Sequence, residues 1–88
     1  MNNNESLYTI RSEWHDHMGD WIRDENLYFK DMDDAWNKYT ELRESIDVPY
    51  GTSVIVRYCD AASISDKNPL GVKYCFTRRW DETKSLDG

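Results

Sequence analysis

The hydrophobic pattern of the chain has a helical period in its middle and an alternating period on either side. Apolar residues recur at 3.6-residue spacing and predict a helix over residues 32–46. Asp31 offers an N-cap carboxylate, and Asp33 and Asp34 fill the first turn, where the helix dipole favours negative charge. Residues 48–51 then turn the chain. The predicted apolar stripe consists of Met32, Ala35, Trp36, Tyr39, Leu42 and Ile46.

Four other segments are typical of β-strands. Residues 7–14 and 21–30 form the first pair, separated by the polar run HDHMG. Residues 52–60 and 71–80 form the second pair, and a long loop joins them, with turn residues from Ser65 to Pro69. The order strand, strand, helix, strand, strand predicts an α+β fold, with one antiparallel sheet and the helix on one face.

The alternation within the strands predicts which side chains face the helix. We expect Tyr8, Ile10, Ser12 and Trp14 to share one face of their strand. In the second hairpin the helix-facing set is Val54, Val56, Tyr58, Val72, Tyr74 and Phe76, and the set pointing away is Ile55, Arg57, Cys59, Lys73, Cys75 and Thr77. The second face of the sheet is then open to solvent or to a partner.

The two cysteines lie on this second hairpin. A register that places Tyr58 opposite Phe76 also places Cys59 opposite Cys75, with their Cβ atoms about 4.5–5.5 Å apart. Such a pair can form a disulfide on oxidation or contact another chain, but two reduced residues on a sheet are the favoured interpretation.

Length and charge limit the classes of function. The 88 residues fit one small domain over 1–88, with flexible termini at 1–6 and 83–88. The net charge of −6 argues against direct binding of nucleic acid or of an acidic membrane, and favours a basic protein partner. The start MNNNES has no apolar segment, so we expect no signal peptide and a cytoplasmic location.

The segment EWHDHMGDW at 13–21 is the one most suggestive of chemistry. His15 and His17 are two residues apart, and Asp16 or Asp20 can join them. A catalytic zinc site needs three protein ligands, and His-x-His alone is a weak pattern. A polar turn between two strands is therefore favoured over a partner-contacting turn or a metal site, and we expect no metal and no cofactor.

Nothing else in the sequence indicates catalysis. There is no Gly-rich phosphate loop and no Gly-x-Ser-x-Gly motif, so we expect a protein that is not an enzyme. Trp36 belongs to the helical stripe and is expected in the core. Trp14, Trp21 and Trp80 lie near strand ends, where they either cap the core or contribute to an interface.

Charge is distributed unevenly along the chain. Residues 13–47 carry eleven acids and four bases, whereas residues 48–80 carry two acids and five bases. The acids are either an ordinary solvated face or a rigid array of negative charge that occupies a basic groove in place of nucleic acid.

The arrangement resembles that of small phage-encoded inhibitor proteins, which include anti-CRISPR proteins and inhibitors of host RNA polymerase. The resemblance covers most of residues 27–82, from Phe29-x-Asp31-Met32-Asp33-Asp34-Ala35 entering the helix, through Gly51-Thr52 opening a hairpin, to Trp80-Asp81-Glu82. It is a resemblance of layout, so it assigns no role to any residue. It implies a compact, non-enzymatic protein that blocks the substrate path of a nucleic-acid-handling machine in the host cytoplasm.

We therefore expect a binding protein that inhibits such a machine, with a CRISPR effector favoured, by steric block or acidic mimicry of nucleic acid. The predicted contact residues are Asp20, Asp24, Glu25, Asp33, Asp34, Glu41 and Glu44. The alternative is a structural or assembly module that dimerises through the open sheet face around Ile55, Cys59 and Cys75. A small enzyme or metal sensor built on His15 and His17 ranks third. The sequence leaves monomer and homodimer both open.

Overall fold

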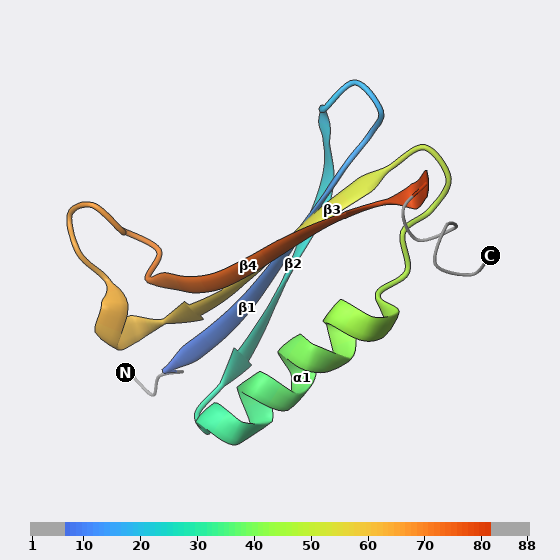
Figure 1. Ribbon diagram of the computed structural model, residues 1–88. Helices are drawn as coiled ribbons and strands as arrows, with labels where there is room; N and C mark the ends of the chain where they lie inside the picture. The colour runs from blue at the N-terminus through green and yellow to red at the C-terminus, as the bar shows by residue number, and fades with distance from the viewer. Residues whose placement is uncertain (1–6, 82–88) are drawn as a thin grey trace.

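The computed structural model describes residues 7–81 and confirms the predicted α+β fold (Figure 1). The chain order is ββαββ, and the four strands form one antiparallel sheet in the order β2-β1-β3-β4. The expected flexible termini at 1–6 and 83–88 lie outside the described residues. The elements are β1 (Tyr8–His15), β2 (Trp21–Phe29), α1 (Met32–Ser45), β3 (Ser53–Asp60), the short 3-10 helix η1 (Ala61–Ser63) and β4 (Val72–Arg79).

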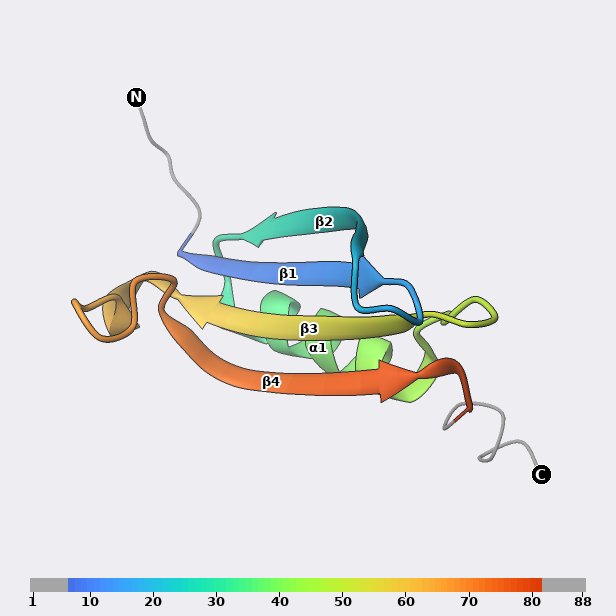
Figure 2. The same cartoon turned by 90° about the horizontal axis from the view of Figure 1, so that it is seen from above.

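The helix α1 covers one face of the twisted sheet and leaves the other uncovered (Figure 2). The backbone of α1 approaches β1 and β2 most closely. Over β3 and β4, large aromatic side chains fill the layer between helix and sheet. No helix within residues 7–81 is long and apolar enough to cross a membrane.

The helix begins where its capping residues predict. The Asp31 carboxylate accepts a hydrogen bond from the Asp33 amide at 2.8 Å, which satisfies one of the free N–H groups of the first turn. Ala35 and Tyr39 are buried on the inner side. The chain leaves the helix at Ile46, one residue earlier than the predicted end, and the Ile46 side chain is itself buried.

The core lies between α1 and the helix-facing sides of β1 and β3. The predicted inward residues of β1 are confirmed, because Ile10, Ser12 and Trp14 are all buried. The Arg23 guanidinium on β2 lies 3.7 Å from the centre of the Trp14 ring and covers it by a cation–π contact. The complete buried cluster is Ile10, Trp14, Ala35, Tyr39, Ile46, Val48, Val54, Val56 and Tyr58.

The predicted register of the second hairpin is wrong. Tyr58 pairs with Tyr74, not Phe76, and Cys59 pairs with Val72, not Cys75. An irregularity between Tyr58 and Cys59 leaves Lys73 as an extra residue on β4. Both cysteines are free thiols, Cys59 buried and Cys75 exposed.

The irregularity also reverses two of the predicted orientations. Val72, paired with Cys59, belongs to the uncovered face, whereas Lys73 lines a pocket on the helix side together with Tyr58 and Tyr74. Strict alternation along β4 cannot anticipate this, because one inserted residue shifts every side chain beyond it to the other face.

Trp36 is not a core residue as predicted. Its side chain keeps 40% of its accessible surface, and its ring lies 5.2–5.7 Å from the rings of Tyr39, Tyr58 and Tyr74. The cause is its position on the flank of α1 that faces β4, where the layer ends and solvent reaches one side of the indole.

Candidate binding surfaces

The segment EWHDHMGDW forms a capped polar turn. Asp16 Oδ1 accepts hydrogen bonds from the amides of Met18 and Asp20, both at 2.9 Å. Gly19 has φ +86°, a conformation that favours glycine, and its amide donates to the Asp16 carbonyl at 2.9 Å. The predicted turn between the two strands is therefore confirmed, and Asp16 holds the backbone of the loop.

The two histidines are separated by the end of β1. His15 is the last residue of the strand, and His17 lies in the turn, so the two histidines are not neighbours on one face of a strand. Residues 7–81 contain no group of three or more His, Cys, Asp or Glu side chains suited to a metal ion.

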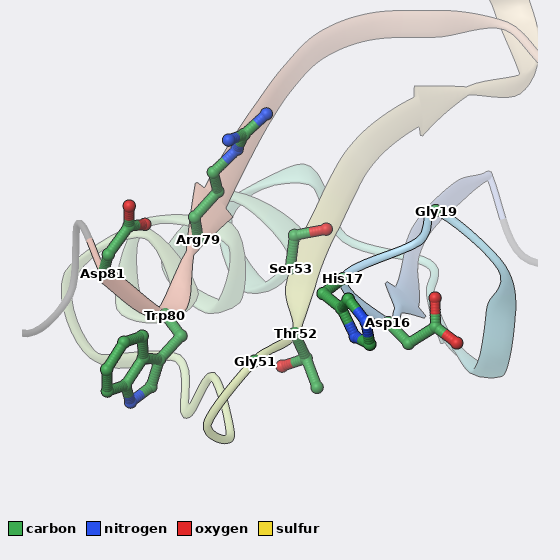
Figure 3. A pocket seen from close by; sticks show the side chains of 9 residues that line it. All are labelled: Asp16, His17, Gly19, Gly51, Thr52, Ser53, Arg79, Trp80 and Asp81. Carbon is green, nitrogen blue, oxygen red and sulfur yellow. The ribbon is translucent and has the colours of Figure 1, made fainter.

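His17 instead lines an open pocket of about 330 Å³ at one end of the sheet (Figure 3). In the figure, Asp16 and His17 lie on one side of Thr52 and Ser53, with Trp80 and Asp81 on the other. Arg79 and two turn glycines complete the lining. Its charged groups have mixed signs, so the pocket has no clear preference for an anion or a cation.

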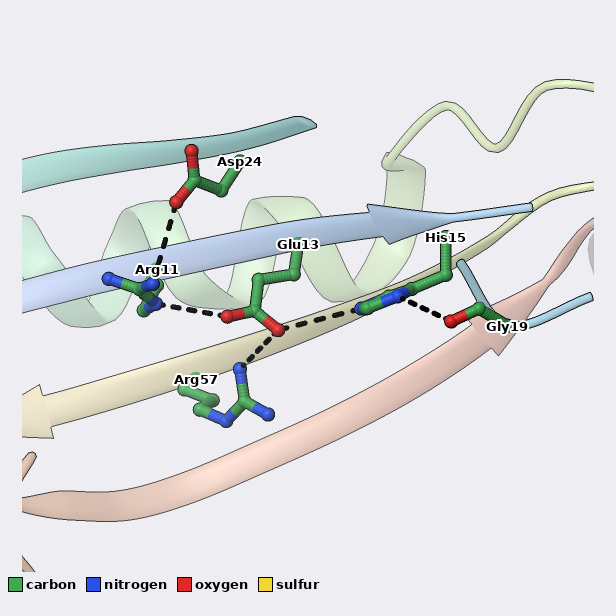
Figure 4. Close-up of polar contacts among 6 residues, drawn as sticks. All are labelled: Arg11, Glu13, His15, Gly19, Asp24 and Arg57. Carbon is green, nitrogen blue, oxygen red and sulfur yellow. Dashed lines mark hydrogen bonds and ion pairs between the residues drawn. The ribbon is translucent and has the colours of Figure 1, made fainter. Parts of the chain in front are cut away.

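The uncovered sheet face carries an ion-pair cluster centred on Glu13 (Figure 4). Arg11 Nε donates to Glu13 Oε2 at 3.2 Å, and Arg11 Nη2 donates to Asp24 Oδ2 at 3.4 Å. Arg57 Nη1 lies 3.2 Å from Glu13 Oε1 and His15 Nε2 lies 3.5 Å from the same oxygen. Neither Arg57 Nη1 nor His15 Nε2 has a partner with hydrogen-bond geometry.

This environment lowers the pKa of Glu13. Burial of its carboxyl alone raises the pKa, but the hydrogen bond from Arg11, the close contact and positive charge of Arg57 and the contact with His15 together outweigh it. The cluster therefore holds Glu13 as a carboxylate. It also gives the centre of this face a polar character that an obligate dimer interface rarely has.

The predicted contact residues are all exposed, but they do not share one surface. Four of them lie on α1, on the side opposite the buried Ala35 and Tyr39. Asp34 and Glu41 are two helical turns apart, and Asp33 and Glu44 are three turns apart, so each pair shares a side of the helix. Within residues 7–81, Glu41 alone among these four has a basic side chain at ion-pair distance, Lys38 at 3.3 Å.

The other three predicted acids lie on different parts of the molecule. Asp24 belongs to the uncovered face, where it pairs with Arg11. Glu25 pairs in register with the inward-facing Ser12 and so points to the helix side of β2. Asp20 lies at the hairpin turn. The sequence placed these acids in one half of the chain, and the fold distributes them over both faces.

A second pocket of about 220 Å³ lies beside the start of α1. Its aromatic walls are Trp36, Tyr58 and Tyr74, whose ring centres are 5.2–5.7 Å apart. Asp60 and Lys73 line it as well, with Lys73 Nζ 3.8 Å from Asp60 Oδ2. We call this the aromatic groove; its complete lining is Met32, Asp33, Trp36, Tyr58, Asp60, Lys73 and Tyr74.

The sequence pattern does not predict this groove. It places Trp36 in the core, Tyr58 in the helix-facing set and Lys73 in the set pointing away. Prediction of the groove requires the register of β3 and β4, because that register turns Lys73 to the helix side. No pattern within either strand specifies that register.

Comparisons with known proteins found no relative for this chain. No family model matches it, and neither a curated protein nor a solved structure is significantly similar.

Proposed function

We propose that this protein is a non-enzymatic binding protein that presents the solvent-facing side of α1 to a basic surface of a nucleic-acid-handling complex, with a CRISPR effector as the favoured target. The supporting observation is the exposed set Asp33, Asp34, Glu41 and Glu44 on one rigid helix. By steric block or mimicry of nucleic acid, this surface excludes the natural ligand from its channel.

The charge density of the helix fits this proposal. Asp33 and Glu44 are eleven residues apart, which corresponds to about 16 Å along a helix axis. One strand of a DNA duplex carries about five phosphates over that axial length. Four carboxylates over a similar distance approach the charge density of such a strand, and the helix holds them without a loss of backbone entropy on binding.

Charge neutralisation on the helix tests the proposal. The variant Asp33→Asn, Asp34→Asn, Glu41→Gln, Glu44→Gln removes the acids of α1 and leaves its buried side unchanged. Its matched control, Asp20→Asn, Glu25→Gln, Asp47→Asn, Asp66→Asn, removes the same charge from four exposed positions outside the helix. Asp20 and Glu25 belong to the predicted contact residues but not to the helix surface of this proposal. The wild type and both variants serve as bait in nuclease-treated bacterial lysates that express a panel of CRISPR effectors, with recovery quantified by mass spectrometry.

We expect the wild type to recover one effector or polymerase, and recovery to fall at least about tenfold for the helix variant but little for the control. Capture should weaken as salt rises, because exposed charges are screened. An equal loss of partner recovery for both variants would show that binding depends on net charge and not on the helix surface. Undiminished capture by the helix variant would exclude α1 as the binding surface.

Dimerisation through the uncovered sheet face is the less favoured alternative. Its predicted centre was Ile55, Cys59 and Cys75, but Cys59 is buried and the middle of the face carries the Glu13 cluster. A molecular mass that stays constant with concentration in light scattering would argue against this alternative.

A further inference from the structure

The aromatic groove combines apolar walls with negative charge. Trp36 and Tyr74 keep 40% and 47% of their accessible surface, so part of each ring is available to a ligand. Asp33 and Asp60 line the same groove, and Lys73 is the single basic residue among its lining residues. Aromatic ring faces and carboxylates both attract cations.

The electrostatics within the groove favour a positive ligand. Burial is the main cause that raises the pKa of the Tyr58 hydroxyl, and the charges of Asp60 and Asp33 raise it further. The negative potential that disfavours a tyrosinate in the groove attracts a cation that enters it. The two carboxylates therefore act on the interior of the groove as well as on its rim.

The size of the groove limits its occupant. Its volume of about 220 Å³ is below the roughly 300–1,000 Å³ typical of pockets for small molecules and cofactors. One long side chain fits this volume. Arginine suits it better than lysine, because a planar guanidinium can stack on an aromatic ring and donate to a carboxylate at the same time.

We propose that the aromatic groove is an anchor site for one arginine side chain of the partner. The guanidinium stacks against Trp36 and Tyr74 and pairs with Asp33 and Asp60, displacing Lys73 from Asp60. Lys73 occupies part of the site in the free protein, at 3.8 Å from Asp60 Oδ2, and so competes with the ligand. This proposal rests on the proposed function, since it assumes a basic partner, and it adds a specific pocket to a general charge attraction.

The test uses the full-length, ¹⁵N-labelled protein and a capped tetra-arginine peptide, with a tetra-citrulline peptide as the neutral control. Citrulline keeps the shape of arginine without its charge. We expect the arginine peptide to shift the Trp36 indole N–H resonance and the amide resonances of Asp33, Lys73 and Tyr74. The citrulline peptide should leave them unchanged. Absence of shifts at these positions with the arginine peptide would overturn the proposal.

Two matched pairs of variants separate the groove from general charge. Asp33→Asn and Asp34→Asn remove the same charge from adjacent exposed positions in the first turn, but Asp33 alone of the two lines the groove. We expect Asp33→Asn to weaken peptide binding about five- to tenfold and Asp34→Asn less than about twofold. Lys73→Gln should tighten binding about threefold, whereas Lys38→Gln, which removes a positive charge from the helix near Glu41, should have a smaller effect.

Failure of the groove and failure of the proposed function give different results. Equal effects within each pair, with peptide shifts spread along α1, would overturn the anchor site and leave the acidic helix as a binding surface. Peptide binding that is confined to the groove, combined with undiminished partner capture by a helix variant that keeps Asp33 (Asp34→Asn, Glu41→Gln, Glu44→Gln), would overturn the acidic helix surface of the proposed function and leave the anchor site intact.

Discussion

The two faces of the sheet differ in burial and in charge. The helix-covered face buries Tyr39, Val54 and Val56 almost completely. The uncovered face has no second layer, and its central residues are Arg11, Glu13 and Arg57, which form ion pairs while part of each side chain stays in water. Burial of apolar area stabilises the first face. The second face exposes ion-paired side chains to water instead of apolar ones, and each exposed ion pair contributes little stability.

The two faces also differ in the side chains that remain free to bind a partner. On the uncovered face the central charges are already paired within the molecule. On the helix side, most acids of α1 and the rings of the aromatic groove keep free surface. The helix side of the sheet therefore contains both the buried core and the proposed interface.

The largest effect is expected in the core. Tyr39→Ala removes a ring that is 1% exposed and that contacts Trp36, Tyr58 and Phe76. We expect the free energy of unfolding to fall by about 3–5 kcal/mol, as for other large-to-small aromatic changes. Urea denaturation followed by far-UV circular dichroism measures it. Thr77→Ala, an exposed β4 residue, is the control, and a similar loss there would contradict the assignment of the core.

A smaller effect is expected at the centre of the uncovered face. Glu13→Gln removes the charge that Arg11, Arg57 and His15 share, and should lower the free energy of unfolding by about 1–2 kcal/mol. In Glu13→Leu the two arginines lose this partner and apolar surface is added; stability equal to that of the wild type would show that the ion pairs of Glu13 contribute no net stability. Urea unfolding at neutral pH compares both variants.

The contribution of Glu13 should depend on pH with a defined sign. Its pKa is lower in the folded protein than its ordinary value of 4.5, so the unfolded chain binds the proton more readily. The stabilisation is therefore complete well above pH 4.5 and is lost as the pH falls through the folded-state pKa. The stability difference between wild type and Glu13→Gln, measured by urea unfolding from pH 7 to pH 3, should shrink on the acid side. A constant difference would exclude the pKa shift.

The smallest effect concerns the thiols and leaves stability unchanged. Cys75 is exposed, whereas burial raises the pKa of Cys59, so we expect Cys75 to react with a disulfide reagent much faster than Cys59 in the native protein. Mass spectrometry after brief labelling should find one modified cysteine, and two after denaturation. Rapid formation of an internal disulfide in the native protein would contradict the observed register.

The parts of the fold that were predictable depend on local chemistry. The Asp31 cap, the turn at Val48 to Gly51 and the alternation of β1 each involve residues near one another in the chain, and each was confirmed. The Asp16 turn belongs with them, because an aspartate and a glycine at these positions determine a turn through their own hydrogen bonds and backbone conformation.

The register of β3 against β4 and the exposure of Trp36 were not predictable in the same way. Both depend on where the irregularity at Lys73 falls and on how far the layer extends over β4. The distribution of the acids is similar: adjacent Asp24 and Glu25 point to opposite sides of β2. Strand pairing decides such positions, and it joins residues that are distant in sequence.

The sequence by itself determined the ββαββ order, the limits of the helix and the acidic character of the molecule, because helical periodicity, capping and charge are properties of neighbouring residues. Only the tertiary structure decided which acids share a surface, which cysteine is buried and that Trp36, Tyr74, Asp33 and Asp60 meet in one groove. Those features arise from packing between separate elements, where a shift of one residue in register exchanges one face of a strand for the other.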